Sequence, residues 1–149
     1  MPVLKRTTSD NSDFQNLVIL LDQDLKIRNG IEHFFFAQFN KLDSIRNVVV
    51  HYSDSKPVGC GAFKKYDVHT VEIKRMFVKE DFRRKGIAEK ILKELEQWAK
   101  ESGFSDCVLE TGKKQPEAIK LYQKSGYEII PNYGQYENVE NSVCMRKII

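Results

Sequence analysis

The 149-residue sequence contains no apolar run near the ~20 residues that a membrane-spanning helix needs. Its first ten residues, MPVLKRTTSD, lack the apolar core of a secretory signal. Only three cysteines are present (Cys60, Cys107 and Cys144), and their odd number and wide spacing argue against a disulfide scaffold. No internal repeat or interdomain linker interrupts the chain. We therefore expect one cytoplasmic domain over residues 1–149, with no membrane association.

The sequence also has few residues suited to metals or nucleic acids. His33, His51 and His69 show no ligand spacing and lie far from the cysteines, so we expect no metal site. The net charge of +3 is too small for a dedicated nucleic-acid binder, and we expect no nucleic-acid partner. Much of the positive charge is concentrated in residues 79–85, which suits a small polyphosphate as well as a nucleic-acid backbone.

Residues 72–100 carry the strongest pattern in the chain. Residues 72–78 are rich in Ile, Phe and Val and predict a strand, and a charged turn follows at 79–85. From Gly86 to about Gly103, apolar residues recur at helical spacing: Ile87, Ala88, Ile91, Leu92, Leu95, Trp98 and Ala99. The first N–H groups of such a helix have no internal partner and carry partial positive charge. The strand, the basic turn and the helix together predict an anion-binding site.

The patterns of the other predicted helices and strands are weaker. Before the central stretch we expect a strand at 3–7, helices at 13–28 and 31–39, and strands at 45–52 and 58–63. After it we expect a strand at 107–111, a helix from Pro116, and strands at 127–130 and 142–149. The strand at 107–111 should pair in parallel with 72–78 through a right-handed crossover. Gly59 and Gly61, inside a predicted strand, indicate a bulge or the close approach of another group.

A family resemblance rests on four short motifs in order. The run Arg83-Arg84-Lys85-Gly86-Ile87-Ala88 fits the Arg/Gln-x-x-Gly-x-Gly/Ala pattern of the GNAT (Gcn5-related) N-acetyltransferases, between a strand and an amphipathic helix as in that family. Val108-Leu109-Glu110, Leu121-Tyr122 and Gly126-Tyr127 follow in the family's order. The sequence thus resembles a bacterial GNAT protein. The resemblance implies an α+β fold with a mixed, mostly antiparallel sheet of six or seven strands and about four helices.

The resemblance implies that acetyl-CoA is the cosubstrate. The backbone of Met76, Phe77 and Val78 should then pair with the pantetheine amides like an added strand. The loop and helix start should hold the pyrophosphate through these residues: Arg83, Arg84, Lys85, Gly86, Ile87 and Ala88. Gln115 stands where the family often has Asn. Lys113 and Lys114 either contact the 3′-phosphate of CoA or form a solvated loop.

The resemblance also implies the catalytic groups. An amine that attacks a thioester must be neutral, so a general base helps at pH 7, and the departing thiolate gains from an acid. Tyr122 matches the family tyrosine near the CoA sulfur, although a helix tyrosine packed in the core is the alternative. Glu72 and Glu110 both compete for the base. Glu72 is preferred, and Glu110 is the second candidate base or a ligand of the substrate ammonium.

The resemblance also implies that the acceptor is an amine of a small molecule or a protein. By resemblance its cleft is formed by residues 13–39 and by the loop at 131–141, which offers Tyr133, Tyr136, Glu137 and Glu140 or is an ordinary surface loop. The expected activity is N-acetyl transfer in a ternary complex. The alternative is a non-catalytic acyl-CoA-binding module that keeps the basic loop and lacks the base and acid. A homodimer would form if the last strand were an exposed edge.

Overall fold

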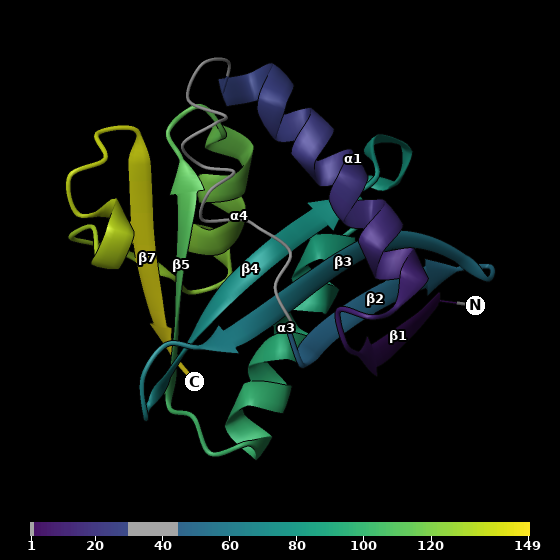
Figure 1. The fold of residues 1–149 in the computed structure, drawn as a ribbon, viewed down its shortest axis with the longest axis horizontal. Helices are drawn as coiled ribbons and strands as arrows, with labels where there is room; N and C mark the ends of the chain where they lie inside the picture. Colours follow the sequence, from purple (N-terminus) through teal and green to yellow (C-terminus); the bar gives the residue numbers. More distant parts are fainter. Residues whose placement is uncertain (1, 30–44) are drawn as a thin grey trace.

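The structure, a computed structural model, describes residues 2–29 and 45–149 and forms a seven-stranded sheet with helices on both faces (Figure 1). The strands are β1 (Pro2–Thr7), β2 (Asn47–Ser53), β3 (Lys56–Lys65), β4 (Thr70–Val78), β5 (Asp106–Gly112), β6 (Glu128–Ile130) and β7 (Ser142–Ile148). The α-helices are α1 (Ser12–Asn29), α3 (Ile87–Glu101) and α4 (Pro116–Lys124). Two 3-10 helices, η2 (Glu80–Phe82) and η3 (Gly134–Tyr136), lie in the loops after β4 and β6.

The order in space is β1-β2-β3-β4-β5-β7-β6, and all neighbours are antiparallel except β4 and β5. This confirms the predicted mixed, mostly antiparallel sheet and the parallel pairing of 107–111. The helix predicted at 31–39 lies outside the described residues. The condition stated for a dimer through the last strand is not met among the described strands, because β7 pairs with β5 on one side and β6 on the other. Among the strands of residues 2–29 and 45–149, β1 and β6 lie at the edges of the sheet.

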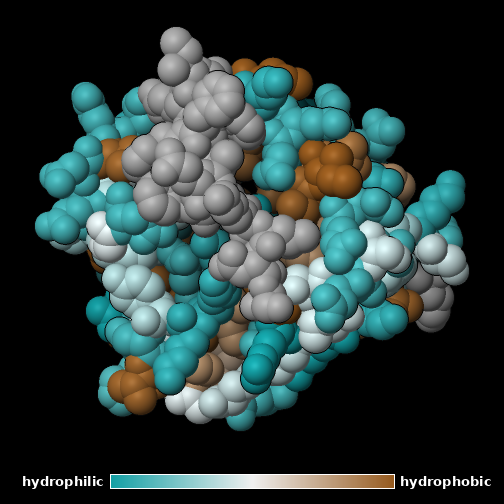
Figure 2. All heavy atoms as spheres, viewed as in Figure 1, coloured by the Kyte–Doolittle hydropathy of each residue, from teal (hydrophilic) through white to brown (hydrophobic). Residues whose placement is uncertain are grey.

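Each face of the sheet carries its own core. Beneath α3 and α4 lies a cluster that includes Val49, Ile91, Leu95 and Leu109. Along β2, Val49 of this cluster alternates with residues of the opposite face, because successive strand side chains point to opposite sides of the sheet. Beneath α1 lies a second cluster that includes Phe14, Leu17, Val18, Leu21 and Val50. The helix predicted at 13–28 is therefore confirmed, and its buried side packs on the sheet. The outer side of α1 exposes Ile19, Leu20 and Ile27, and Figure 2 shows hydrophobic side chains over this helix on an otherwise largely hydrophilic face.

A bulge interrupts β4 opposite Gly61. The β3–β4 register shifts between Cys60 and Ala62, so β4 contains one residue more than β3 over this stretch. Arg75 takes up the extra residue with a left-handed φ of 61°. A Cβ on Gly61 would lie 2.5 Å from the Met76 sulfur and 2.9 Å from Ile91, so the strand and α3 can meet only over a glycine. Both the bulge and the close approach predicted from the two glycines are present.

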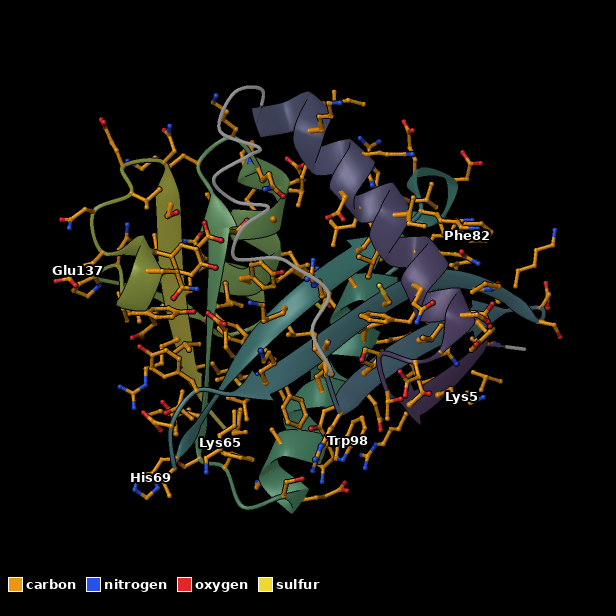
Figure 3. The ribbon with its side chains drawn as sticks, in the orientation of Figure 1. Lys5, Lys65, His69, Phe82, Trp98 and Glu137 are labelled. Atoms are coloured by element: carbon orange, nitrogen blue, oxygen red, sulfur yellow. The ribbon has the colours of Figure 1, made fainter. Side chains whose placement is uncertain are left out.

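The bulge decides which β4 side chains share a face. Val71 and Ile73 belong to the core cluster under α3, so Glu72 and Lys74 lie on the opposite face. After the extra residue the parity reverses, and Phe77 joins the cluster under α1. β4 itself runs from the turn with His69 to the loop with Phe82, at opposite ends of the molecule (Figure 3).

Candidate active site

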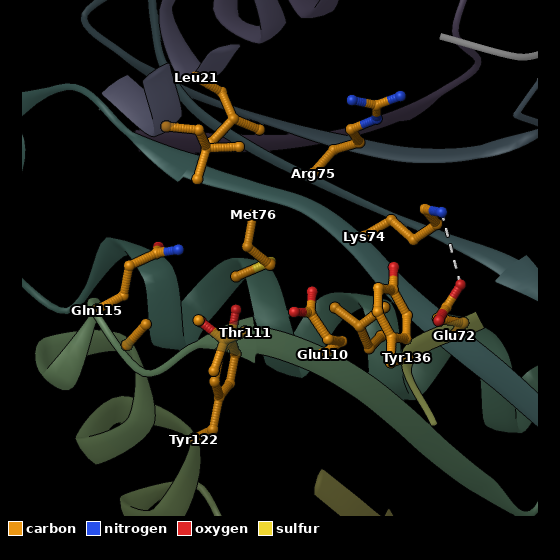
Figure 4. Close-up of a pocket in the computed structure, with 14 residues that line it drawn as sticks. Leu21, Glu72, Lys74, Arg75, Met76, Glu110, Thr111, Gln115, Tyr122 and Tyr136 are labelled. Atoms are coloured by element: carbon orange, nitrogen blue, oxygen red, sulfur yellow. Dashed lines mark ion pairs between the residues drawn. The ribbon is translucent and has the colours of Figure 1, made fainter. Parts of the chain in front are cut away.

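A cleft opens where β4 and β5 separate. The two strands pair only from Thr70↔Asp106 to Glu72↔Val108, and beyond this point no pairing joins them. The space between them forms a cavity of about 120 Å³. Its lining comes from α1, β4, β5, α4 and η3, and consists of Leu21, Leu25, Glu72, Ile73, Lys74, Arg75, Met76, Glu110, Thr111, Gly112, Gln115, Ala118, Tyr122 and Tyr136 (Figure 4). The cleft therefore gathers all three predicted catalytic residues and Gln115.

Glu110 lies on β5 in the middle of the cleft. Its Oε2 accepts a hydrogen bond of 2.8 Å from Ser142 Oγ on β7. Burial raises the pKa of Glu110 to about 7 against the lowering effect of Ser142, and the nearby Glu72 raises it further. A carboxyl group with this pKa exchanges its proton near neutral pH.

Glu72 stands at the closed end of the cleft and is held on both oxygens. Its Oε2 accepts a 2.5 Å hydrogen bond from Tyr133 Oη, and its Oε1 lies 3.6 Å from Lys74 Nζ. Burial and then the Glu72 charge raise the pKa of the Tyr133 phenol, which therefore remains a donor. Glu72 is thus oriented by neighbours that Glu110 does not have.

Tyr122 reaches the cleft from α4. Its ring packs edge-to-face on Tyr127, with ring centroids 5.9 Å apart, and the residue is 7 % exposed. Burial, followed by the charge of Glu110, raises the pKa of its phenol. Tyr122 is therefore a core tyrosine whose side chain also lines the cavity, and its role as the acid stays a prediction.

The acceptor loop predicted at 131–141 divides into an inner and an outer side. Tyr133 and Tyr136 face inward: Tyr133 binds Glu72, and Tyr136 is 3 % exposed and lines the cleft. Their rings meet edge-to-face at 5.8 Å, and Tyr66 packs on Tyr133 at 5.1 Å. Glu137 and Glu140 are exposed, and Glu137 points away from the cleft (Figure 3).

The basic loop reaches the start of α3. Gly86 is the N-cap of α3 with φ 77°, and Arg84 has φ 65°, so two left-handed residues turn the chain into the helix. A Cβ on Gly86 would meet nothing within 4 Å, and Arg84, Lys85 and Gly86 are exposed. Buried Ile87 and half-buried Ala88 anchor the helix start. The loop thus presents main-chain N–H groups and cationic side chains to open space, which fits a phosphate group.

Arg83 differs from its neighbours in the loop because its side chain turns back onto the protein. Its Nε donates a 2.8 Å hydrogen bond to the Val78 carbonyl, and its guanidinium lies 5.6 Å from the centre of the Phe77 ring. A terminal nitrogen also lies 3.7 Å from Asp24 of α1. Arg83 therefore ties together the end of β4, the loop and α1.

The backbone at the end of β4 faces the cleft in part. Lys79 N–H donates to Val58 C=O, and Phe77 pairs with Cys60 on β3. By antiparallel alternation the main-chain groups of Met76 and Val78 then point away from β3, toward the gap before β5. Lys113 and Lys114 are exposed on the loop after β5, and Gln115 is the N-cap of α4.

Sequence reasoning missed Lys74 and Arg75 as cleft residues and Ser142 as the hydrogen-bond partner of Glu110. Lys74 had a signal, because it lies two residues after Glu72 and shares its face in a strand. Arg75 had no signal in the sequence, because only the bulge in β4 brings its side chain to the face that carries Glu72. Ser142 lies 32 positions from Glu110 and follows from the β5–β7 register.

Two further observations concern metals and membranes. Over residues 2–29 and 45–149, no three His, Cys, Asp or Glu side chains are grouped closely enough to hold a metal ion. In the same part of the chain, every helix falls short of the length and apolar character needed to cross a bilayer.

Comparison with known proteins assigns the family. Residues 15–127 match the model of the acetyltransferase (GNAT) family. The chain is 31 % identical over 148 residues to the IAA acetyltransferase of Azospirillum brasilense, covering 95 % of this chain and 96 % of the relative. It is 36 % identical over 92 residues to the uncharacterised N-acetyltransferase YsnE of Bacillus subtilis, a match spanning 60 % of each chain.

A solved structure agrees with this assignment. A Klebsiella pneumoniae protein described as an acyl-CoA N-acyltransferase superposes with a TM-score of 0.83 at 25 % identity, covering 99 % of this chain and 97 % of that one. The chain belongs to the GNAT family, and it is an acetyltransferase by that membership. The predicted family and enzyme class are confirmed. Solved members of this fold hold acetyl-CoA or CoA.

Proposed function

We propose that this protein transfers the acetyl group of acetyl-CoA directly to an amine in a ternary complex formed in the β4–β5 cleft. The observation that carries the proposal is the meeting of Glu110 and Tyr122 in one cleft, which is also lined by β4, the strand that leads into the loop before α3. A proton acceptor and a proton donor in one cleft are what attack on a thioester requires. When bound, acetyl-CoA supplies the carbonyl carbon that the amine attacks.

The loop before α3 would hold the diphosphate of the donor. The left-handed Arg84 and Gly86 and the first turn of α3 offer N–H groups, while Arg84 and Lys85 add charge. The main-chain groups of Met76 and Val78 would pair with the pantetheine amides. Because Arg83 is engaged with the Val78 carbonyl, its role would be to orient the end of β4 and not to contact phosphate.

Glu110 is the better candidate for the base. A base with a pKa near the working pH combines a useful ionised fraction with a real affinity for the proton. Its pKa of about 7 meets this condition. Glu72 was preferred from the sequence, but both of its oxygens face donors of the protein, so its role would be to orient Tyr133 and Lys74.

Tyr122 would act as the acid. As the amine nitrogen bonds to the carbonyl carbon and the carbon–sulfur bond breaks, Glu110 takes the amine proton and Tyr122 gives its phenol proton to the sulfur. The raised pKa keeps Tyr122 protonated before transfer. A later proton exchange with solvent restores both groups.

The alternative, a non-catalytic acyl-CoA-binding module, has no use for Glu110 buried beside Tyr122. A thiol-release assay over a panel of small amines and peptides separates the two. We expect release of CoA thiol that depends on both acetyl-CoA and an amine. Calorimetric binding of CoA with no amine-dependent release from any acceptor would instead establish the binding module.

A further inference from the structure

We infer that Ser142 is a positioning residue for acetyl transfer, whose hydroxyl holds one oxygen of Glu110 and directs the other oxygen to the amine proton. This inference rests on the function proposed above and concerns the base of the same cleft. Ser142 is not among the residues that line the cavity, so it would act on the amine only through Glu110.

The pairing of β5 with β7 places Ser142 beside Glu110. Cys144 lies directly opposite Glu110, and Ser142 lies opposite Gly112, two residues away on each strand. Residues two apart share a face of a strand, so Ser142, Cys144 and Glu110 lie on one face of the sheet. Ser142 is therefore the diagonal neighbour of Glu110, and its Oγ donates to Glu110 Oε2 at 2.8 Å.

The loop before β7 holds Ser142 by both of its main-chain groups. Ser142 N–H donates to the Val139 carbonyl at 3.1 Å, and Asn132 Nδ2 donates to the Ser142 carbonyl at 3.1 Å. The same amide nitrogen donates to the Val139 carbonyl at 3.0 Å, and Ser142 is only 3 % exposed. Because this backbone is already fixed, the Ser142 hydroxyl can bind Glu110 without ordering any further chain.

The hydrogen bond distinguishes the two oxygens of Glu110. A hydroxyl that donates to an ionised carboxylate makes a charge-assisted bond, and this bond stabilises the ionised form. An oxygen that already accepts such a bond has less affinity for a further proton. The amine proton should therefore pass to Oε1, while Oε2 stays with Ser142.

The groups that act on Glu110 do so in both directions. Burial raises its pKa most, and the Ser142 hydroxyl has the next largest effect and lowers it. Glu72 raises the pKa of Glu110 and Lys74 lowers it, each by less than Ser142 does. Arg75 is a further cation in the lining of the cavity. Ser142 is thus the strongest of the groups that favour the ionised base.

The other titratable groups that face Glu110 are neutral at pH 7. Tyr122 and Tyr136 line the cavity with Glu110 (Figure 4), and Cys144 lies opposite it on β7. Burial raises the pKa of all three groups. From α1 the cavity receives leucine side chains. Removal of the Ser142 hydroxyl should therefore raise the pKa of Glu110 without a compensating titration of these neighbours.

A titration by carbon-13 NMR tests the inference without turnover. The carboxyl carbon of Glu110 would be followed with pH in glutamate-labelled protein and assigned with Glu110→Gln. In the wild type, Glu110 should be half protonated near pH 7. In Ser142→Ala this midpoint should lie about one pH unit higher or more, because a hydrogen bond to a charged group contributes about that shift.

Kinetics test whether the hydroxyl matters to the reaction. At pH 7 the kcat/KM of Ser142→Ala should be about fivefold lower, because the ionised fraction of Glu110 falls from about a half to about a tenth. The rise of kcat/KM with pH should move upward together with the NMR midpoint. The Kd for CoA should stay constant. The same amine serves for both proteins, so its own titration cancels in the comparison.

Thr70→Val is the matched control. Thr70 Oγ1 donates a 2.8 Å hydrogen bond to the carboxylate of Asp106, and both residues are buried at the start of the β4–β5 pairing, outside the cavity lining. Thr70→Val loses the same kind of bond and should leave the Glu110 midpoint and the pH profile unchanged. Ser142→Thr keeps the hydroxyl and should retain the wild-type midpoint.

The outcomes separate this inference from the proposed function. If no amine is acetylated by the wild type, the proposed function fails and the inference falls with it. If amines are acetylated but Ser142→Ala leaves the Glu110 midpoint unchanged, or Thr70→Val raises it equally, the function stands and the inference is overturned. A midpoint that rises in Ser142→Ala while the pH profile stays in place would also overturn it.

Discussion

The start of α3 and the closed end of the cleft differ in what holds them in shape. At the start of α3 the geometry is main-chain: Arg84 and Gly86 have left-handed φ, and the side chains around them are exposed. At the closed end the geometry is made by side chains from distant segments, as in the hydrogen bond between Tyr133 and Glu72, 61 positions apart. We therefore expect binding of the acetyl donor at the start of α3 to depend on backbone conformation. Binding of the acceptor at the closed end of the cleft should depend on single side-chain groups.

The largest effect should come from the residue between the two halves. Tyr122→Phe removes the proposed proton donor and keeps the ring that packs on Tyr127, so kcat should fall about 100-fold through loss of general acid catalysis. Steady-state kinetics with calorimetry of CoA provide the measurement. A fall in CoA affinity with kcat preserved would place Tyr122 in donor binding and not in proton transfer.

A glycine substitution tests the main-chain half. Gly86→Ala puts a side chain on a residue with φ 77°, a conformation that costs L-residues about 1–2 kcal/mol, so the Kd for CoA should rise about 10-fold. Gly103→Ala is the matched control at the other end of α3, with φ 94° and equally open space. It should cost similar stability in thermal unfolding and leave the Kd unchanged. If both variants raised the Kd for CoA equally, the left-handed conformation of Gly86 would not be the cause of CoA binding at the loop.

A hydroxyl deletion tests the side-chain half and should give the smallest change. Tyr133→Phe loses the hydrogen bond to Glu72 and keeps the ring contacts with Tyr66 and Tyr136, so the acceptor KM should rise about 3- to 10-fold. The Kd for CoA should stay constant. Tyr66→Phe serves as control for the ring stack, and an equal rise in that variant would show that the bond to Glu72 is not the cause.

The sequence predicted what local patterns govern. The α3 helix followed from 3.6-residue spacing and the position of Gly86, and the parallel β5 followed from a short apolar run after a strand and helix. The anion site at the start of α3 stays a prediction. The bulge was signalled only as a general expectation from Gly59 and Gly61. Its consequence, that Lys74 and Arg75 enter the cleft, depends on the β3–β4 register.

The remaining features were beyond local patterns. The position of β7 between β5 and β6 was not predicted, because strand order depends on which edges are left to pair. That insertion brings Ser142 to Glu110 and Tyr133 to Glu72. Side-chain contacts across 32 and 61 positions carry no periodic signal, so the preference for Glu72 over Glu110 from the sequence could not take them into account.

The central claim is that Glu110 takes the amine proton in the β4–β5 cleft, and the pH dependence of kcat/KM tests it most directly. A base must be ionised, and burial raises the pKa of Glu110 from 4.5 to about 7, so the rate should rise with pH and level off above about 7. Glu110→Gln should lower kcat/KM by about 100-fold and abolish the rise of kcat/KM with pH below about 7. Glu72→Gln should keep this rise. If the rise of kcat/KM that levels off near pH 7 persists in Glu110→Gln and vanishes in Glu72→Gln, Glu110 is not the base.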